Sequence, residues 1–572
     1  MNGRVQIIAW RARHLVRVAG AALALAGGLA GCGNNPWPDG SEGQSVIRSA
    51  MTESTPRHLD PTASYWSNDT VVTYQVYEPP YGYHYLKRPF ELVPKSAAAV
   101  VKPTYLDKDG NKLPDDAPAE LVAESVYDVP IKPGIKFQPH PAFAKDAQGK
   151  YLYHSMKPGE LGDRRTPMDF KETGTRELTA EDFVYAVKRH ATTRITTPIY
   201  GIFSEYVLGL KEYGDLIKAE DKKLRQGMDP ASQDKPFLDF RQWPLIGATA
   251  PEKDLLRLRI KGKYPQWKYW MQMTFMAPIP WEADAFYAQP GMAERGMTLD
   301  QWPVGTGPYM VTEFTKDRRI VMQRNPNYRG EPYPCEGNPG DKEKGLLEDC
   351  GKPTPFIDTI IATVEREATP LRNKFRDGYY DLEIFERTDT GNSYIVEAND
   401  SEEVRADYKT KGFEFAQSAD VNSYIVGFNM LDPVIGWGDT PEQRERNRKL
   451  RQAISIAIDW EEYSKIFPKK AGETAMSPLP QGIPGSREGT PEGINPVTHR
   501  LEGGKAVRRS IEEARQLMVE AGFPQGRDAK TGRPLVIAYD FFRTPTPERK
   551  PQLDGMVRQF AKPDHQLEGR TT

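Results

Sequence analysis

The chain has 572 residues, of which 38% are hydrophobic and 27% charged, and its formal net charge is -2. This composition is typical of a folded globular protein, and the length predicts two or three domains. The near balance of 77 basic and 79 acidic residues excludes the basic surface with which nucleic-acid-binding proteins contact phosphate groups.

The first 31 residues have the pattern of a secretory signal peptide. Four arginines precede or flank an apolar stretch from Val18 to Ala30, which closes with Leu29-Ala-Gly-Cys32. This ending is typical of a bacterial lipobox, whose cysteine is lipidated and begins the mature protein. We therefore expect residues 1–31 to be removed, Cys32 to carry the lipid outside the cytoplasm, and residues 32–45 to form a tether. The alternative is an uncleaved anchor, for which the apolar stretch is short.

Two cysteines, Cys335 and Cys350, remain once Cys32 is lipidated. They lie in one polar segment, residues 331–355, and an exported protein with one remaining pair favours a disulfide that closes a surface loop. Free thiols or a metal site are the alternatives, but no CxxC motif and no histidine lies in the segment.

The first part of the mature chain has short elements. Residues 70–77 are apolar enough to form a strand or a buried helix, and periodicity does not distinguish the two. Residues 86–177 are rich in Pro, Lys and Asp and indicate short strands and long loops. A clear amphipathic helix follows at Leu178–Arg189, with Thr179 as its N-cap and acidic residues in its first turn.

Later segments alternate strand and helix patterns. Val304–Phe314 predicts a glycine turn that enters a strand, with Arg319–Arg324 as its hairpin partner. Helices are expected at Arg446–Ile458 and Ser510–Ala521, the second ended by Gly522. Ser423–Asn429 reads as a strand, and the chain ends with a strand, a helix and a strand at Leu535–Phe542, Pro547–Ala561 and Gln566–Thr571.

Five of these segments, in this order, carry a resemblance to a known family. They are Leu178–Arg189; Pro303–Tyr309 with Arg319–Val321 and Arg324–Tyr328; Phe428–Asn429; Lys449–Trp460 with Pro478–Pro480; and Glu513–Pro524. Together with the lipobox, they resemble the oligopeptide- and dipeptide-binding class of extracytoplasmic solute-binding proteins of ABC transporters, the bacterial solute-binding proteins of family 5.

The resemblance implies an α/β fold: a two-lobed clamp of the periplasmic-binding-protein type II, in the large class with an extra N-terminal subdomain, closing on a ligand between its lobes. Lobe I would comprise residues 46–85 and 178–330, the extra subdomain 86–177, the disulfide loop 331–355, and lobe II 356–572. The family normally continues further, so the resemblance predicts an incomplete lobe II that lacks the segment supplying an aspartate for the amino group of the ligand.

Motifs of catalytic chemistry are missing from the sequence. It contains no HExxH, GxSxG, GxxxxGK[ST] or CxxC motif, and no two of the eight histidines are spaced i, i+4. The turn Gly305-Thr306-Gly307 precedes Pro308 and a strand rather than a helix N-terminus, which argues against a phosphate loop. We therefore expect a protein that is not an enzyme and that needs no metal and no cofactor.

Candidate binding residues follow from the needs of an extended peptide, which is held by strand backbone groups and by aromatic and small polar side chains. They are Tyr77, Glu78, Thr306, Tyr424, Phe428 and Asn429. The structural alternative for each is an ordinary role, with the aromatic rings in the core and Glu78 solvated before two prolines.

The function that the resemblance implies is a lipid-anchored substrate-binding subunit of an ABC importer, which captures peptides and delivers them to a permease energised by a partner ATPase. The same fold could bind a sugar or a metal chelate, or serve a sensory or structural lipoprotein. An extracytoplasmic hydrolase is less well supported, because no nucleophile motif is present.

Overall fold

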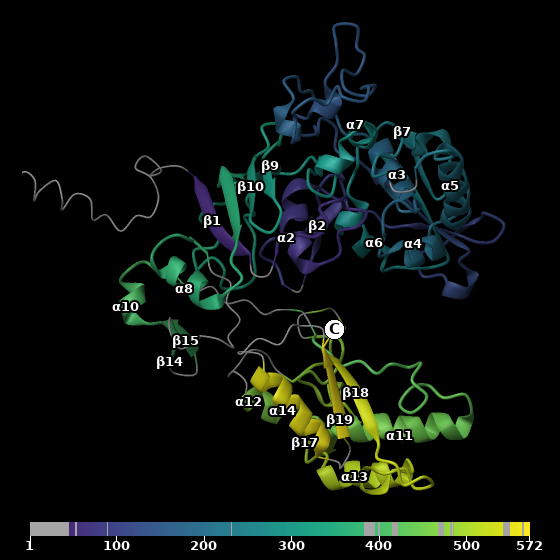
Figure 1. Ribbon diagram of the computed structural model, residues 1–572, viewed down its shortest axis with the longest axis vertical. Helices are drawn as coiled ribbons and strands as arrows, with labels where there is room; N and C mark the ends of the chain where they lie inside the picture. Colours follow the sequence, from purple (N-terminus) through teal and green to yellow (C-terminus); the bar gives the residue numbers. More distant parts are fainter. Residues whose placement is uncertain are drawn as a thin grey trace, which may run out of the picture. The chain divides into compact units, whose positions relative to one another are not determined.

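The computed structural model describes residues 45–51, 54–88, 90–229, 232–382, 395–398, 401–414, 421, 423–466, 474–480, 483, 485–541, 550–562 and 566–571 (Figure 1). The expected signal peptide, Cys32 and residues 32–44 of the tether lie outside these ranges. By packing, the chain divides into two units, Met1–Lys87 with Glu91–Glu383, and Arg88–Phe90 with Ile384–Thr572.

The first unit contains a four-stranded sheet in the order β1 (Val46–Met51), β13 (Thr359–Val364), β10 (Arg319–Arg324) and β9 (Tyr309–Thr315). Strands β9 and β10 form the predicted hairpin, and β1 pairs in parallel with β13. Residues 359–364 thus pack in the first unit, which runs to Glu383. The start of lobe II at residue 356 stays a prediction.

A second sheet of the first unit has the order β5 (Lys112–Leu113), β4 (Thr104–Leu106), β6 (Glu124–Pro130), β8 (Leu255–Lys261) and β7 (Ala248–Glu252). Buried and more exposed positions alternate along β8, as expected for a sheet with one covered face. The sheet joins strands from the expected extra subdomain with strands from expected lobe I, and the assignment of residues to those two parts stays a prediction.

The first unit also contains seven α-helices within its described ranges. They are α2 (Ser67–Val76), α3 (Ala180–Arg189), α4 (Tyr200–Tyr206), α5 (Leu210–Leu224), α6 (Trp267–Trp270), α7 (Trp281–Tyr287) and α8 (Ala368–Arg376). Of these, α2, α3 and α4 pack against the two sheets. The open question of residues 70–77 is settled in favour of a helix, α2, which ends at Val76. The predicted helix at Leu178–Arg189 is confirmed as α3, where the backbone N–H of Thr179 donates to the Asp182 carboxylate at 2.9 Å.

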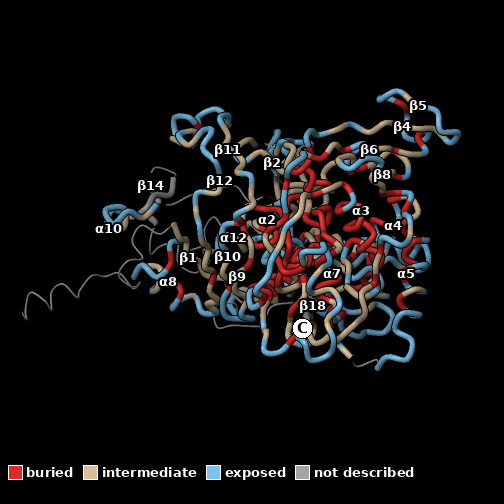
Figure 2. Tube along the Cα trace, turned by 90° about the horizontal axis from the view of Figure 1, so that it is seen from above, coloured by how far each residue is buried: buried red, intermediate tan, exposed pale blue. Residues whose placement is uncertain are grey.

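The interior of the first unit is one continuous core. Its largest fully buried side chains include Trp267, Phe183 and Phe286. Figure 2 shows the buried residues gathered around α2, α3 and α7. Helices α3 and α7 are buried along most of their length, whereas α2 buries Val72 and Val76 and exposes Val71 and Tyr74 at the surface.

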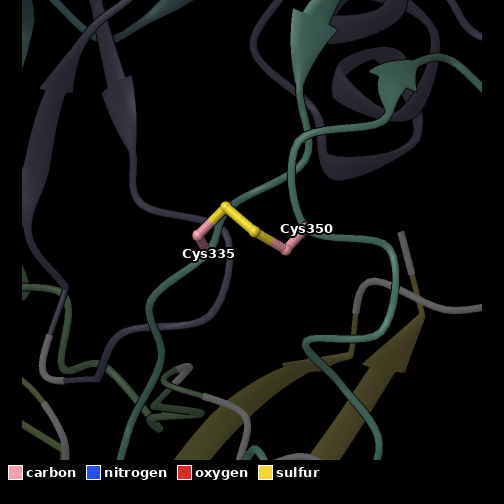
Figure 3. The surroundings of a disulfide bond; sticks show 2 residues. All are labelled: Cys335 and Cys350. Carbon is pink, nitrogen blue, oxygen red and sulfur yellow. A yellow bond between two sulfur atoms is a disulfide. The ribbon is translucent and has the colours of Figure 1, made fainter.

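Short strands complete the first unit. Strand β2 (Tyr81–Tyr83) pairs with β3 (Leu92–Pro94), and β11 (Glu331–Pro332) pairs with β12 (Pro353–Thr354). The loop between β11 and β12 contains the disulfide between Cys335 and Cys350, which confirms the predicted pairing (Figure 3).

The second unit contains the helices α10 (Ala406–Lys409), α11 (Pro441–Ala457), α12 (Trp460–Ile466), α13 (Ile511–Glu520) and α14 (Lys550–Ala561). The strands β18 (Val536–Phe541) and β19 (Gln566–Thr571) pair in parallel, and two hairpins join β14 (Ile395–Ala398) to β15 (Ser401–Val404) and β16 (His499–Glu502) to β17 (Lys505–Arg508). A separate core includes Leu450 of α11 and Met518 of α13.

The predicted elements of the second unit are confirmed with one exception. Helix α11 starts at Pro441, five residues before the predicted start, because Thr440 and Gln443 form a capping box there. The predicted strand at Ser423–Asn429 is wrong, since its described residues have no strand assignment. None of the helices in the described ranges is long and apolar enough to cross a membrane.

Candidate functional site

Three of the candidate residues lie together in the first unit, where α2 meets the Gly305-Thr306-Gly307 turn. Tyr77, Glu78 and Thr306 are all buried, and the backbone N–H of Gly307 donates to the carbonyl of Val76 at 2.8 Å. A Cβ on Gly305 would lie 2.0 Å from the same carbonyl oxygen. The glycine turn therefore lets two backbone segments approach closely.

Glu78 is held by an ion pair. An Nη1 of Arg329 lies 2.7 Å from Oε1 of Glu78 and 2.8 Å from Oε2. Burial raises the pKa of the Glu78 carboxyl, and the charge of Arg329 opposes that rise. The alternative of a solvated Glu78 is therefore excluded, and the carboxylate positions the segment that follows α2.

This ion pair continues into a network of charges. The backbone carbonyl of Lys95 accepts a hydrogen bond from Arg329, and the Lys95 ammonium pairs with Glu331 of β11. Lys132 donates to the same Lys95 carbonyl at 2.7 Å. The network joins four segments that are far apart in the sequence, so it fixes the surroundings of Glu78.

Exposed side chains that the sequence did not single out lie on α2 and on the two residues before it. We call Tyr65, Trp66, Val71 and Tyr74 the α2 aromatic face; their exposed fractions are 62%, 55%, 66% and 40%. The Tyr65 ring lies 6.3 Å from that of Phe275, and the Arg57 guanidinium lies 5.1 Å from the ring centre of Trp66. The sequence does contain a pattern that could have revealed this surface: the pair Tyr65-Trp66, followed by Val71 and Tyr74 three residues apart. Residues at this spacing share one face only if the segment is helical.

Two tyrosines at this face, Tyr74 and Tyr83, have raised pKa values. Burial raises the pKa of Tyr74 to about 12, and the nearby Tyr83 of β2 adds to the rise. The Tyr74 hydroxyl donates to the side-chain oxygen of Gln272 at 3.4 Å. Burial also raises the pKa of Tyr83, with Tyr269 of α6 as a second cause. Exposed rings with hydroxyl groups can bind ligands that carry both apolar and polar groups.

The other three candidates belong to the second unit. Tyr424 is 83% exposed and its neighbour Ile425 is 78% exposed. Phe428 is half-buried against the second core, and the Asn429 side chain accepts the backbone N–H of Leu431 at 3.0 Å. Asn429 therefore holds a turn, whereas Tyr424 presents its ring to solvent.

No group of three or more His, Cys, Asp or Glu side chains within the described ranges could hold a metal ion. The buried His140 is held by neutral hydrogen bonds instead: its Nδ1 accepts the N–H of Ala142 at 3.1 Å, and its Nε2 lies 3.0 Å from the hydroxyl of Tyr287. Because Nδ1 accepts, Nε2 carries the proton and donates to Tyr287. This histidine belongs to the core.

Comparisons with known proteins agree with this two-unit α/β architecture. The family model described as bacterial extracellular solute-binding proteins, family 5 (middle), matches residues 173–563. The structure is similar to the periplasmic binding protein DppA of Helicobacter pylori in complex with the peptide STSA, with a TM-score of 0.53 and 15% identity over 92% of this chain and 73% of that one. It is also similar to the oligopeptide-binding protein AppA of Bacillus subtilis in complex with a nonapeptide, with a TM-score of 0.51 and 14% identity over 93% and 74% of the two chains.

Among curated proteins, a heme-binding protein A from Haemophilus influenzae is 24% identical over 286 residues, which are 49% of this chain and 41% of that protein. A putative binding protein of Brucella melitensis is 27% identical over 165 residues, or 28% and 21% of the two chains. The matched parts thus span less than half of these relatives.

The fold and the family match define a solute-binding protein of the two-lobed α/β class. The chain belongs to the bacterial extracellular solute-binding proteins of family 5. The predicted family and fold class are therefore confirmed.

Proposed function

We propose that the chain is the substrate-binding subunit of an ABC importer that captures short peptides outside the cytoplasm and delivers them to a membrane permease. The observation that carries this proposal is the family match over residues 173–563. Support for peptides comes from the shared fold with two proteins whose solved structures contain a bound peptide. Such a protein binds and releases its ligand, so no bond is made or broken.

We further propose that the protein is a lipoprotein. The arginine-flanked apolar stretch and Leu29-Ala-Gly-Cys32 support cleavage before Cys32 and its lipidation. The anchor would keep the binding protein near its permease, which raises the local concentration for delivery.

For the binding site, we propose the α2 aromatic face in the first unit and Tyr424 with Phe428 and Asn429 in the second. Exposed aromatic rings bind varied side chains with little loss of conformational entropy, because they have only two side-chain dihedrals. Tyr77, Glu78 and Thr306 are proposed to contribute by holding the backbone at the end of α2, since all three are buried.

A second candidate ligand is a tetrapyrrole. The Haemophilus relative is named a heme-binding protein, and the α2 aromatic face would suit a flat apolar ring as well as a peptide. Sugars and metal chelates remain further alternatives within this fold.

The test is ligand retention and thermal stabilisation. The chain from Gly33 onward is purified, and its melting temperature is measured alone, with a pool of tetrapeptides and with hemin. A ligand that binds only the folded state raises the melting temperature. We expect the peptide pool to raise it, and mass spectrometry to find unhydrolysed short peptides in the purified protein.

Other outcomes have distinct meanings. Stabilisation by hemin alone would replace peptides with a tetrapyrrole. Shortened peptides after incubation would indicate a hydrolase, and a cooperative transition indifferent to both ligands would contradict the proposed capture of peptides.

A further inference from the structure

One exposed arginine lies against the α2 aromatic face. The guanidinium carbon of Arg57 is 5.1 Å from the ring centre of Trp66, and both residues are exposed. In the described part of the chain, the Arg57 guanidinium forms no ion pair and no hydrogen bond; the hydrogen bond of this residue comes from its backbone N–H. A positive charge and an aromatic ring therefore lie side by side at the surface.

A buried carboxylate fixes the backbone on both sides of this contact. Oδ1 of the fully buried Asp69 accepts the backbone N–H of Arg57 at 2.8 Å and that of His58 at 3.4 Å. Oδ2 of the same residue accepts the N–H groups of Tyr65 and Trp66, each at 3.4 Å. Because one side chain ties the two segments together, the arginine and the ring are pre-organised, and less conformational entropy is lost when a ligand binds.

The carboxylates that contact this loop already have other partners. The Asp69 carboxylate is surrounded by the four N–H groups. Oδ1 of Asp60 lies 2.6 Å from an Nη1 of Arg189. Oδ2 of Asp300 lies 3.1 Å from Nδ1 of His58. The charge of the neighbouring arginine is therefore left for a group that comes from outside the chain.

The chemistry of this pair favours one kind of ligand group. A guanidinium can contact a ring with its face and still have N–H donors available in its own plane. Two of these donors match the two oxygens of a carboxylate. The ring beside them offers apolar area to a neighbouring side chain of the ligand. The pair is thus suited to a carboxylate next to an apolar group, and the last residue of a peptide has this chemistry.

We propose that Arg57 binds the C-terminal carboxylate of the peptide, while Trp66 contacts the side chain of the last peptide residue. This assignment rests on the proposed function and makes Arg57 a specificity-determining residue of the α2 aromatic face. Peptides with a free C-terminus bind more tightly than peptides whose C-terminus is amidated. The preference weakens as the salt concentration rises, because the ion pair lies at the surface.

The experiment titrates the full chain calorimetrically with two pools of tetrapeptides that lack acidic side chains, one with free C-terminal carboxylates and one amidated. The variant is Arg57→Met, which removes the charge and keeps an apolar side chain. Arg241→Met is the matched control: the Arg241 guanidinium lies 3.6 Å from the ring centre of Trp281, but it pairs with Asp239 at 2.7 Å. We expect the wild type and Arg241→Met to prefer the free acids about tenfold, and Arg57→Met to prefer them less than about twofold.

The other outcomes separate this proposal from the proposed function. If the wild type binds both pools equally, peptide capture stands and the role of Arg57 is overturned. If it binds neither pool, both are overturned. A preference for free acids that persists in Arg57→Met would assign the carboxylate to another residue.

A third pool identifies the source of the carboxylate. Its peptides are amidated and carry one glutamate in their interior. We expect this pool to bind like the amidated peptides. Binding as tight as that of the free acids, and equally dependent on Arg57, would place a side-chain carboxylate at this arginine and contradict the assignment to the C-terminus.

Discussion

Arg329 and Glu78 form an ion pair between a loop after β10 and the end of α2, 251 residues apart in the sequence, with an Nη1–Oε1 distance of 2.7 Å. The Glu78 side chain is 5% exposed and that of Arg329 26%. A buried ion pair of this kind can add little net free energy to folding. Removing one partner is nevertheless strongly destabilising, because the other charge is then left buried without a counter-charge.

Replacing Arg329 with methionine should therefore lower the free energy of unfolding by about 3 kcal/mol, because Glu78 is left buried without its counter-charge. Denaturant unfolding measures this. Arg257→Met is the matched control, since its partner Asp128 is 45% exposed, and it should cost less than about 1 kcal/mol. Adding Glu78→Gln to Arg329→Met should recover part of the lost free energy of unfolding, because the buried charge is removed. If Arg329→Met and Arg257→Met lower the free energy of unfolding equally, this explanation is wrong.

Gly305→Ala should destabilise the first unit by about 3 kcal/mol. Its new Cβ would meet the carbonyl oxygen of Val76 at 2.0 Å, and the backbone there has little room to move. Gly201→Ala in α4 is the control, because nothing lies within 4 Å of its Cβ position. That control should gain about 0.5 kcal/mol, since alanine favours a helix over glycine. A tolerated Gly305→Ala would show that the two segments are not in close contact.

The stability of the first unit should fall in mild acid because of His140. Burial lowers the pKa of this histidine from 6.5 to about 3, so its contribution is complete above pH 6.5 and is lost as the pH falls toward the folded-state value. Between pH 6.5 and 5 the loss from this residue is about 2 kcal/mol. Unfolding measured at both pH values checks this, and His140→Gln should have a shallower pH dependence whatever its absolute stability.

Trp66→Ala tests the α2 aromatic face. The side chain is 55% exposed, so stability should change by less than about 0.5 kcal/mol, while affinity for retained peptides should fall about tenfold. Calorimetric titration measures the affinity. Ile246→Ala removes a side chain of similar exposure elsewhere in the same unit and should leave binding unchanged. If Trp66→Ala and Ile246→Ala have the same affinity for peptide, the α2 aromatic face is not part of the peptide-binding site.

Tyr424→Ala tests the second unit in the same way. Tyr424 is 83% exposed, and we expect a loss of affinity of about tenfold with no change in the unfolding transition. The control is Leu431→Ala, at a side chain that is 93% exposed. If Leu431→Ala lowers the affinity for peptide as much as Tyr424→Ala does, the loss comes from a changed loop conformation and not from the Tyr424 ring.

Local patterns predicted most of the secondary structure. Thr179 and Ser510 cap the helices at α3 and α13, and the hairpin of β9 and β10 follows its glycine turn. These features depend on neighbours within a few residues, so they can be predicted from a single sequence. The strand expected at Ser423–Asn429 failed because a strand needs a partner, which local pattern does not supply.

Local sequence patterns predicted only part of the candidate site. Tyr77, Glu78 and Thr306 were chosen from separate segments, and the structure brings them together, but it also buries them. The exposed Trp66 and Tyr74 were missed because the segment was not known to be helical.

By itself, the sequence determined the family, the cysteine pair of the loop and the order of helices and strands, because motif spacing, composition and capping residues are local properties. Only the tertiary structure decided that Glu78 is buried against Arg329, that Gly305 approaches the carbonyl of Val76, and that β6 pairs with β8. Those relationships join residues far apart in the chain, and the burial of apolar surface that brings them together is a property of the whole unit.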